Sequence, residues 1–166
     1  MTPTRWDALT REGNKRDRLG QYARCTGCGE ADPRCLQGPR GTGSGDEERP
    51  VLCAECRLAV EGKSRTERHH PAGRANDPIA VPIPANDHAV LSDAQHDWPM
   101  ATLRNPDGSP LLAAAAALRG WLDVLRLVVE RTVGWIPAFL EWLDAVLRSQ
   151  VAERWWETFS WEGGPA

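Results

Sequence analysis

The chain of 166 residues lacks any long apolar segment that is free of charged residues. Its most apolar part, residues 110–160, is interrupted by Arg, Asp and Glu throughout, which excludes a membrane-spanning helix. The first seven residues contain one Arg with no apolar run behind it, so we expect no secretory signal, a cytoplasmic protein and no membrane partner. With 41% hydrophobic and 26% charged residues, the composition is typical of a globular protein.

The sequence also lacks the strong excess of basic residues that a dedicated nucleic-acid-binding domain has. The net charge is −3, with 14 Arg or Lys against 11 Asp or Glu in residues 1–76 and 6 against 12 in residues 77–166. The two halves therefore carry +3 and −6. A mildly basic first half is compatible with a phosphate-bearing partner but does not require one. Arg outnumbers Lys by 18 to 2, which a GC-rich coding sequence explains as well as phosphate recognition does.

Composition divides the chain into three segments, and none of them repeats another. Residues 1–63 hold all five cysteines, residues 64–104 hold all four histidines, and residues 110–160 hold most of the leucine and tryptophan. A glycine-rich loop is predicted at residues 38–45, and a turn-forming linker precedes the last segment.

The last segment has the apolar spacing of amphipathic helices, predicted over residues 111–133 and 137–159. The apolar residues of the first recur at intervals of three and four: Leu118, Trp121, Leu122, Leu125, Val128 and Val129. We expect a helical hairpin whose tryptophans fill its interface. The alternative is that this apolar surface forms a homodimer or binds a protein partner.

Two Cys-x-x-Cys pairs, Cys25 with Cys28 and Cys53 with Cys56, are the first motif with clear chemistry. Each pair places two thiolates on a tight turn, and two pairs complete a tetrahedral structural zinc site. A disulfide framework fits poorly with an odd fifth cysteine and no secretory signal, and a redox dithiol needs only one pair. We expect Cys35 to be a small hydrophobic residue or a surface thiol.

Three of the four histidines fall in one window that predicts a strand at residues 64–70, a loop at 71–78, a strand at 79–83 and then a short helix. Asn86 or Asp87 is the predicted N-cap of this helix, which extends to Gln95 and carries His88 in its first turn. Adjacent imidazoles at His69 and His70 indicate metal binding or proton transfer.

The pattern His-His-x-x-Gly-x-x-Asn, a short strand and Asn-x-His resembles the HNH endonucleases, also called His-Me finger or ββα-metal nucleases. The residues that carry the resemblance are His69, His70, Gly73, Asn76, Asn86 and His88. The resemblance implies an α+β fold in which a zinc-knuckle-stabilised ββα-metal module precedes the C-terminal helices. It also implies hydrolysis of DNA phosphodiester bonds that leaves a 5′-phosphate and a 3′-hydroxyl.

By the same resemblance, His70 matches the general base that takes a proton from water, and Asn76 matches the asparagine that braces the loop and orients the base. His69 and His88 match the ligands of a catalytic divalent ion. Arg68 and Arg74 flank the histidines and are predicted to contact DNA phosphates, although solvated loop charge explains them nearly as well.

The chain departs from the family pattern at the start of the helix. Pro84 and Asp87 stand where many relatives have a second pair of cysteines, and Ser92 stands where some have a third imidazole. His96 is expected to face solvent near the helix end. The catalytic ion is Mg²⁺ or another divalent metal, since two imidazole ligands favour Mn²⁺, Ni²⁺ or Zn²⁺ on softness.

The resulting hypothesis is a zinc-stabilised, metal-dependent HNH endonuclease acting on DNA. The alternative is a catalytically inactive zinc-binding adaptor, or a DNA-binding module, that acts through its C-terminal helices.

Overall fold

The computed structural model describes residues 5–38 and 50–157, with side chains from residue 9 onward. The predicted glycine-rich loop therefore lies outside the described residues except for Gly38, as do residues 158–160 of the last predicted segment. The chain has the predicted α+β class, with two small antiparallel sheets among its helices. Packing divides it into two compact units, Met1–Leu127 and Val128–Ala166, which differ from the three segments defined by composition.

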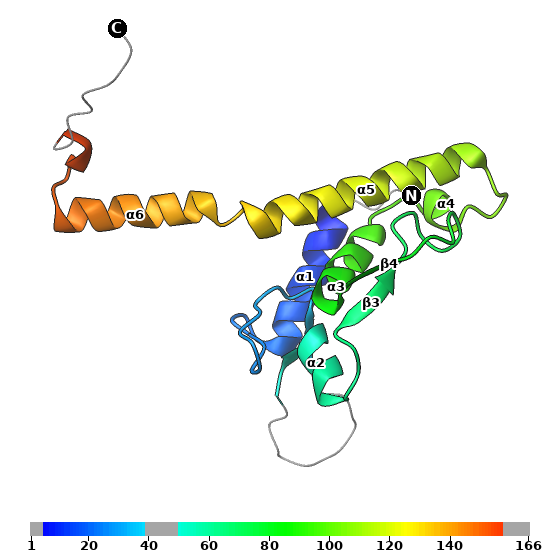
Figure 1. Ribbon diagram of the computed structural model, residues 1–166, viewed down its shortest axis with the longest axis horizontal. Helices are drawn as coiled ribbons and strands as arrows, with labels where there is room; N and C mark the ends of the chain where they lie inside the picture. Colours follow the sequence, from blue (N-terminus) through cyan, green and yellow to red (C-terminus); the bar gives the residue numbers. More distant parts are fainter. Residues whose placement is uncertain (1–4, 39–49, 158–166) are drawn as a thin grey trace, which may run out of the picture. The chain divides into compact units, whose positions relative to one another are not determined.

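A strand–strand–helix motif forms the centre of the first unit, in the order that the sequence predicts (Figure 1). Strands β3 (Thr66–His69) and β4 (Val81–Pro84) pair antiparallel, with His69 opposite Val81, and α3 (Ala85–Gln95) follows directly. Pro82 and Pro84 of β4 have no backbone N–H to donate. The sheet tolerates them because each of its two strands is an edge strand. The motif places the end of β3 beside the first turns of α3.

The predicted N-cap of α3 is wrong, because the helix begins at Ala85 with Pro84 as its cap residue. Asn86 already lies inside the first turn, and its side chain caps a different helix, α2 (Ala54–Val60). The predicted helix end at Gln95 and the place of His88 in the first turn are confirmed.

The second small sheet brings the two cysteine pairs together. Strand β1 (Leu36–Gln37) pairs antiparallel with β2 (Leu52–Cys53), so that Leu36 lies opposite Cys53, and α2 starts immediately after β2. Cys53 is the N-cap of α2, and its Sγ accepts the backbone N–H of Cys56 at 3.4 Å. The second pair is therefore held in the first turn of a helix.

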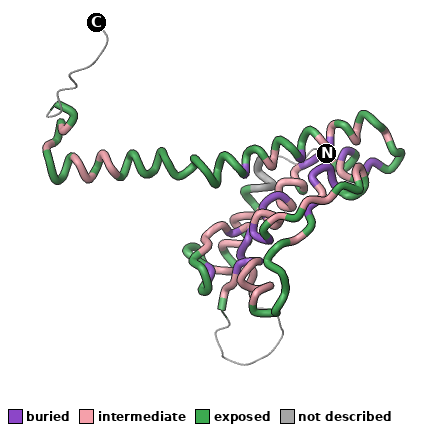
Figure 2. Tube along the Cα trace, in the orientation of Figure 1, coloured by how far each residue is buried: buried purple, intermediate pink, exposed green. Residues whose placement is uncertain are grey.

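One hydrophobic cluster joins this cysteine region to the strand–strand–helix motif. Leu36 and Cys53 pack in the same buried cluster as Val90 and Leu91 of α3 and Leu127 of α5 (Pro110–Thr132). A second cluster contains Ala72, Trp98 and Ala116, which connects the loop after β3 to α5. The first cluster thus joins α3 to both the cysteine region and α5. Figure 2 shows buried positions on several segments of the first unit.

Besides Leu127, helix α5 packs on the first unit through small residues. Ala116 and Gly120 are buried, and a Cβ on Gly120 would lie 1.9 Å from the carbonyl oxygen of Pro71. Only glycine allows the helix to approach this closely. The larger apolar residues that the spacing predicts to be packed are exposed, with Leu118 at 68% and Trp121 at 53%.

Two further helices complete the first unit. Helix α1 (Arg5–Leu19) contacts α3 through Arg11, whose guanidinium lies 3.4 Å from Asp93 and 2.7 Å from Asp97. Helix α4 (Met100–Arg104) ends at Asn105, which adopts a left-handed φ of 40°. The carbonyls at the end of α4 accept hydrogen bonds from the loop after β3, as described below.

The second unit contains the end of α5 and α6 (Ile136–Gln150), in which no residue is buried. The second helix predicted at residues 137–159 is present, but it ends at Gln150, nine residues before the predicted end. After Gln150 the chain turns back, and the indole N–H of Trp155 donates to Asp144 at 2.8 Å. The guanidinium of Arg148 lies 5.2 Å from the ring centre of Trp156. Packing of α5 and α6 as a hairpin stays a prediction.

Within the described residues we find no helix with the length and apolar character needed to span a lipid bilayer.

Candidate functional site

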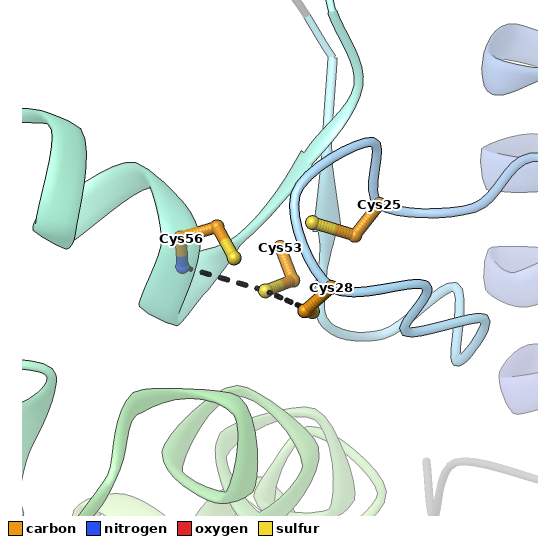
Figure 3. A group of neighbouring side chains, drawn as sticks. All are labelled: Cys25, Cys28, Cys53 and Cys56. Atoms are coloured by element: carbon orange, nitrogen blue, oxygen red, sulfur yellow. Dashed lines mark hydrogen bonds between the residues drawn. The ribbon is translucent and has the colours of Figure 1, made fainter.

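The four cysteines of the two Cys-x-x-Cys pairs converge on one point (Figure 3). Their sulfur atoms all lie within 4.8 Å of one another, and Cys28 Sγ is 3.6 Å from Cys53 Sγ. In a tetrahedral zinc–thiolate site with metal–sulfur bonds of about 2.3 Å, neighbouring sulfurs are about 3.8 Å apart. The cluster therefore has the ligand type, number and spacing for a metal ion such as zinc.

The thiols of this cluster differ in acidity. Burial by itself raises the pKa of Cys25, but backbone N–H groups of Cys53, Gly27 and Cys28 outweigh it and lower the pKa to about 6. Burial and the neighbouring thiols raise the pKa of Cys56. The first cysteine therefore loses its proton easily, but its negative charge makes deprotonation of the other thiols less favourable. A bound cation would compensate that charge and favour the remaining thiolates.

Local backbone contacts explain why the two pairs meet. The N–H of Thr26, inside the first pair, donates to the carbonyl of Val51 at 3.0 Å, which ties that turn to the start of β2. Gly27 leaves room for the second pair, because a Cβ there would lie 3.0 Å from Cys56 Sγ. Cys35 is fully buried outside the cluster, so it is the predicted small hydrophobic residue and not a surface thiol.

A separate pocket of about 260 Å³ lies at the end of β3 and the start of α3. Its lining includes the three histidines and both arginines that the sequence singled out: Arg68, His69, His70, Arg74 and His88. These residues come from a strand, a loop and a helix separated by up to 20 positions in the chain. The fold thus brings to one pocket the side chains predicted to act as base, metal ligands and phosphate contacts, whereas Asn76, also predicted as catalytic, is not in its lining.

The rings of His69 and His88 lie side by side in the lining of this pocket, edge to face. Their ring centres are 5.5 Å apart and the ring planes meet at 78°. An ion bound to an imidazole nitrogen lies about 3.2 Å from the ring centre, so this separation can be bridged by one ion. Burial, followed by the nearby His88 and His70, lowers the pKa of His69 to about 4. His69 is therefore neutral near pH 7, as a metal ligand must be.

Glu67 fixes the orientation of His88, and the sequence prediction missed it. Nδ1 of His88 lies 2.7 Å from Oε2 of Glu67, a distance at which a protonated ring nitrogen donates to a carboxylate. Glu67 lines a neighbouring pocket of about 360 Å³ that also contains His88. With Nδ1 engaged on that side, Nε2 is the nitrogen left for a metal ion. The sequence could have indicated Glu67, because a residue two positions before His69 on the same strand lies on the same face of the sheet.

The backbone of His70 is held from two sides. Its carbonyl accepts hydrogen bonds from the N–H of Gly73 and from Nε2 of Gln95, each at 2.9 Å, and Gln95 also donates to Pro71 at 3.2 Å. Gln95 is a second residue that the sequence prediction missed, since nothing in the pattern links it to this loop. Nδ1 of His70 is buried and has no hydrogen-bond partner among the described residues. His70 as a whole is half-buried and lines the pocket.

Asn76 ties the loop after β3 to α4. Its Nδ2 donates to the carbonyl of Ala72 at 3.0 Å and to that of Thr102 at 2.9 Å. Gly73 supports the same turn with a left-handed φ of 76°. Among the described contacts Asn76 makes no hydrogen bond to His70, so any influence on that side chain passes through the loop.

The other polar residues near the motif divide into two groups. Arg68 and Arg74 are exposed at the pocket, and Ser92 lines it at the position predicted for a third imidazole. His96 is exposed and is not part of the pocket, while Asp93 is paired with Arg11 of α1. Within the described residues, the four cysteines form the one group of three or more His, Cys, Asp or Glu side chains with metal-binding spacing. The histidine pocket is not a group of this kind.

Comparison of the chain with protein-family models, with curated proteins and with solved structures found no match.

Proposed function

We propose that this chain is a metal-dependent HNH-type endonuclease that hydrolyses DNA phosphodiester bonds at the histidine pocket. The observation that carries the proposal is the convergence in one cavity of the histidines and arginines that the sequence motif marks. Their positions on a strand–strand–helix motif agree with the ββα-metal arrangement that the resemblance implies.

In this proposal His70 acts as the general base that takes a proton from the attacking water. Imidazole is the side chain whose ordinary titration range suits this role near neutral pH. The backbone contacts from Gln95 and Gly73 position His70, and Asn76 braces the loop that follows it. The exposed side chains of Arg68 and Arg74 bind phosphate oxygens of the DNA.

His69 and His88 hold the catalytic divalent ion, which is Mg²⁺ or another divalent metal. Bound there, the ion supplies positive charge for the oxygen that leaves phosphorus. The two residues suit the role because His69 is neutral and His88 is oriented by Glu67. With two protein ligands, the remaining coordination positions are available to water and phosphate.

The cysteine cluster holds a structural zinc ion through Cys25, Cys28, Cys53 and Cys56. Four thiolates complete a tetrahedral site, so this ion has no open position for a substrate. Its role is to join the two turns of a region whose hydrophobic cluster is small. Thiolate ligands require reduced cysteines, which supports a cytoplasmic location.

A plasmid-cleavage assay with Mg²⁺, Mn²⁺ or Ni²⁺ tests the catalytic proposal. We expect His70→Ala to lower cleavage by about 100-fold or more, the usual contribution of a general base. The matched control is His96→Ala, which removes the exposed fourth histidine and should leave cleavage unchanged. Equal cleavage by wild type and His70→Ala would contradict the assignment.

The second candidate function is a non-catalytic zinc adaptor or DNA-binding module that recruits a partner or a second copy through its C-terminal helices. The exposed apolar residues of α6 favour it, with Phe139 at 42%, Leu140 at 56% and Trp142 at 59% exposure. It predicts salt-sensitive retention of DNA, or binding of a protein, with no cleavage products in the plasmid assay. Light scattering with and without DNA tests for a homodimer.

A further inference from the structure

Asn86 is a buried polar residue that joins the helix that begins at the second cysteine pair to the helix that carries His88. It is 7% exposed and lies in the first turn of α3, two residues before His88. Its Oδ1 accepts the backbone N–H of Glu55 at 3.1 Å, and its own N–H lies 3.4 Å from Oε1 of Glu55. Buried polar groups with reciprocal bonds fix the relative position of the two elements that carry them.

Glu55 lies between the two cysteines of the second pair, in the first turn of α2. Asn86 therefore caps the same turn that presents Cys53 and Cys56 to the cluster. A third contact joins the regions, because the thiol of Cys35 donates to the carbonyl of Asn86 at 3.4 Å. These three bonds connect the cysteine cluster to the start of the helix that carries His88.

Side-chain packing adds to this connection. Val90 and Leu91, on the turn after His88, are each 3% exposed and pack in the cluster that contains Cys25 and Cys53. A helix held by buried contacts at consecutive turns moves as a rigid element. We expect a displacement of the cysteine turns to reach His88 directly through α3, whereas His69 is paired with Val81, at the end of β4 farther from α3.

We propose that Asn86 is a positioning residue that couples the two metal sites, so that an ion in the cysteine cluster strengthens divalent-metal binding by His69 and His88. The proposal rests on the proposed function, because it assumes that these histidines bind a metal. Without its ion the cysteine turn is no longer fixed, and α3 loses the register that holds His88 beside His69. By thermodynamic linkage the effect is reciprocal, since metal at the histidines equally strengthens metal binding at the cysteines.

The first test measures Mn²⁺ binding by electron paramagnetic resonance in the full chain loaded with one zinc ion. Mn²⁺ is chosen because it competes poorly for thiolates. We expect Asn86→Ala to weaken Mn²⁺ binding by about fivefold or more, the lower end of typical couplings between sites. Asn86→Asp keeps an oxygen acceptor for the Glu55 N–H and should recover most of the affinity. His96→Ala, at an exposed position just after the same helix, is the control.

The second test measures the reciprocal effect. Zinc affinity is determined by competition with a nitrogen chelator, with and without saturating Mn²⁺. In wild type, Mn²⁺ should tighten zinc binding by the same factor that zinc tightens Mn²⁺ binding, and in Asn86→Ala this factor should fall toward one. A residue that merely stabilised the fold would weaken zinc binding without changing its dependence on Mn²⁺.

The outcomes separate this proposal from the proposed function. Absence of Mn²⁺ binding in wild type would overturn both. Wild-type Mn²⁺ binding that Asn86→Ala leaves within twofold, in protein that retains its zinc, would overturn the coupling alone. If Asn86→Ala does not fold, Asn86→Ser decides the question, because it keeps a small polar side chain but shortens it away from the N–H of Glu55. An unchanged reciprocal factor in that variant would then overturn the coupling.

Discussion

The cysteine cluster and the histidine pocket differ in how completely the protein surrounds a bound ion. The cluster supplies four thiols within 4.8 Å of one another, whereas the pocket supplies two imidazoles beside a cavity of about 260 Å³ that exposed arginines also line. A closed tetrahedral set is typical of structural metal, and a partial set with room beside it is typical of a reactive centre. The comparison teaches that the cysteine cluster has the complete ligand set that suits a structural ion, whereas the histidine pocket has the open arrangement that the proposed chemistry requires.

The largest effect on stability is expected from replacing a buried cysteine of the cysteine cluster. Cys53→Ser is expected to release the metal and abolish cooperative unfolding, because structural zinc contributes about 10 to 16 kcal/mol of apparent binding free energy. Metal analysis and thermal unfolding measure this. Cys35→Ala is the matched control, since Cys35 is equally buried but lies outside the cluster. Retention of stoichiometric zinc by Cys53→Ser would show that the four thiols do not form the site.

The next largest effect is a pH dependence of stability that arises from the burial of His69 in the histidine pocket. Its pKa of about 4 lies below the ordinary value of 6.5, so the unfolded chain takes up a proton that the folded protein does not. The stability that His69 contributes is complete above pH 6.5 and is lost as pH falls toward 4, by up to about 3 kcal/mol. Denaturant unfolding without added divalent metal measures this slope. His69→Gln should remove it, and His96→Gln should not; a slope that survives in His69→Gln contradicts the assignment.

A smaller effect is expected where α5 supports the open site. Gly120→Ala places a Cβ against the carbonyl of Pro71, next to His70, and should lower the free energy of unfolding by about 1 to 3 kcal/mol. Cleavage should fall as the loop shifts. Gly13→Ala in α1 is the control, because its Cβ meets nothing within 4 Å and alanine favours helix. Equal stability of the two variants would show that α5 does not constrain the loop.

The smallest effect is expected at Glu67, which acts on the open site through His88. Glu67→Ala should weaken divalent-metal binding by about 10- to 100-fold, the usual effect of losing the partner of a metal-bound histidine. Glu67→Gln keeps an acceptor for Nδ1 and should lose less. Calorimetric titration of the zinc-loaded protein measures both, with Glu141→Gln on α6 as an exposed control. Unchanged affinity in Glu67→Ala would show that His88 does not need this carboxylate.

The features that local spacing determines could be predicted from the sequence. The Cys-x-x-Cys pairs and the order of strand, loop, strand and helix follow from short-range pattern and turn residues. The grouping of His69, His70 and His88 in one pocket was expected from the resemblance to HNH endonucleases, and the part played by Gln95 was missed. The roles of His70, His69 and His88 remain predictions until they are measured.

Other features depend on contacts between distant residues, which a local pattern does not contain. Helix α1 is rich in charged residues and is attached by Arg11 to Asp93, 82 positions away. The N-cap prediction failed because Asn86 bonds to Glu55, 31 positions away. The end of α6 was misplaced because Trp155 returns to Asp144 instead of continuing the helix.

The faces of α5 show a different limit of sequence reasoning. The helix has large apolar residues on one side and small ones on another, and the pattern favours the large ones as the packed face. In the structure, Ala116 and Gly120 are buried while Leu122 and Leu125 are 52% and 59% exposed. Close approach to the Pro71 backbone selects the small residues, and hydrophobicity alone does not reveal that approach.

Because α6 buries none of its residues, its helical form depends mainly on its own hydrogen bonds and on the contacts that Trp155 and Trp156 make with its last turns. A 15-residue helix with so little tertiary support is marginal in water, since propagation barely offsets the cost of nucleation. We therefore expect its amide protons to exchange with solvent much faster than those of α3. A ligand that covers the apolar side of α6 would slow this exchange. Deuterium uptake by α6 can therefore be used to screen for molecules that bind there.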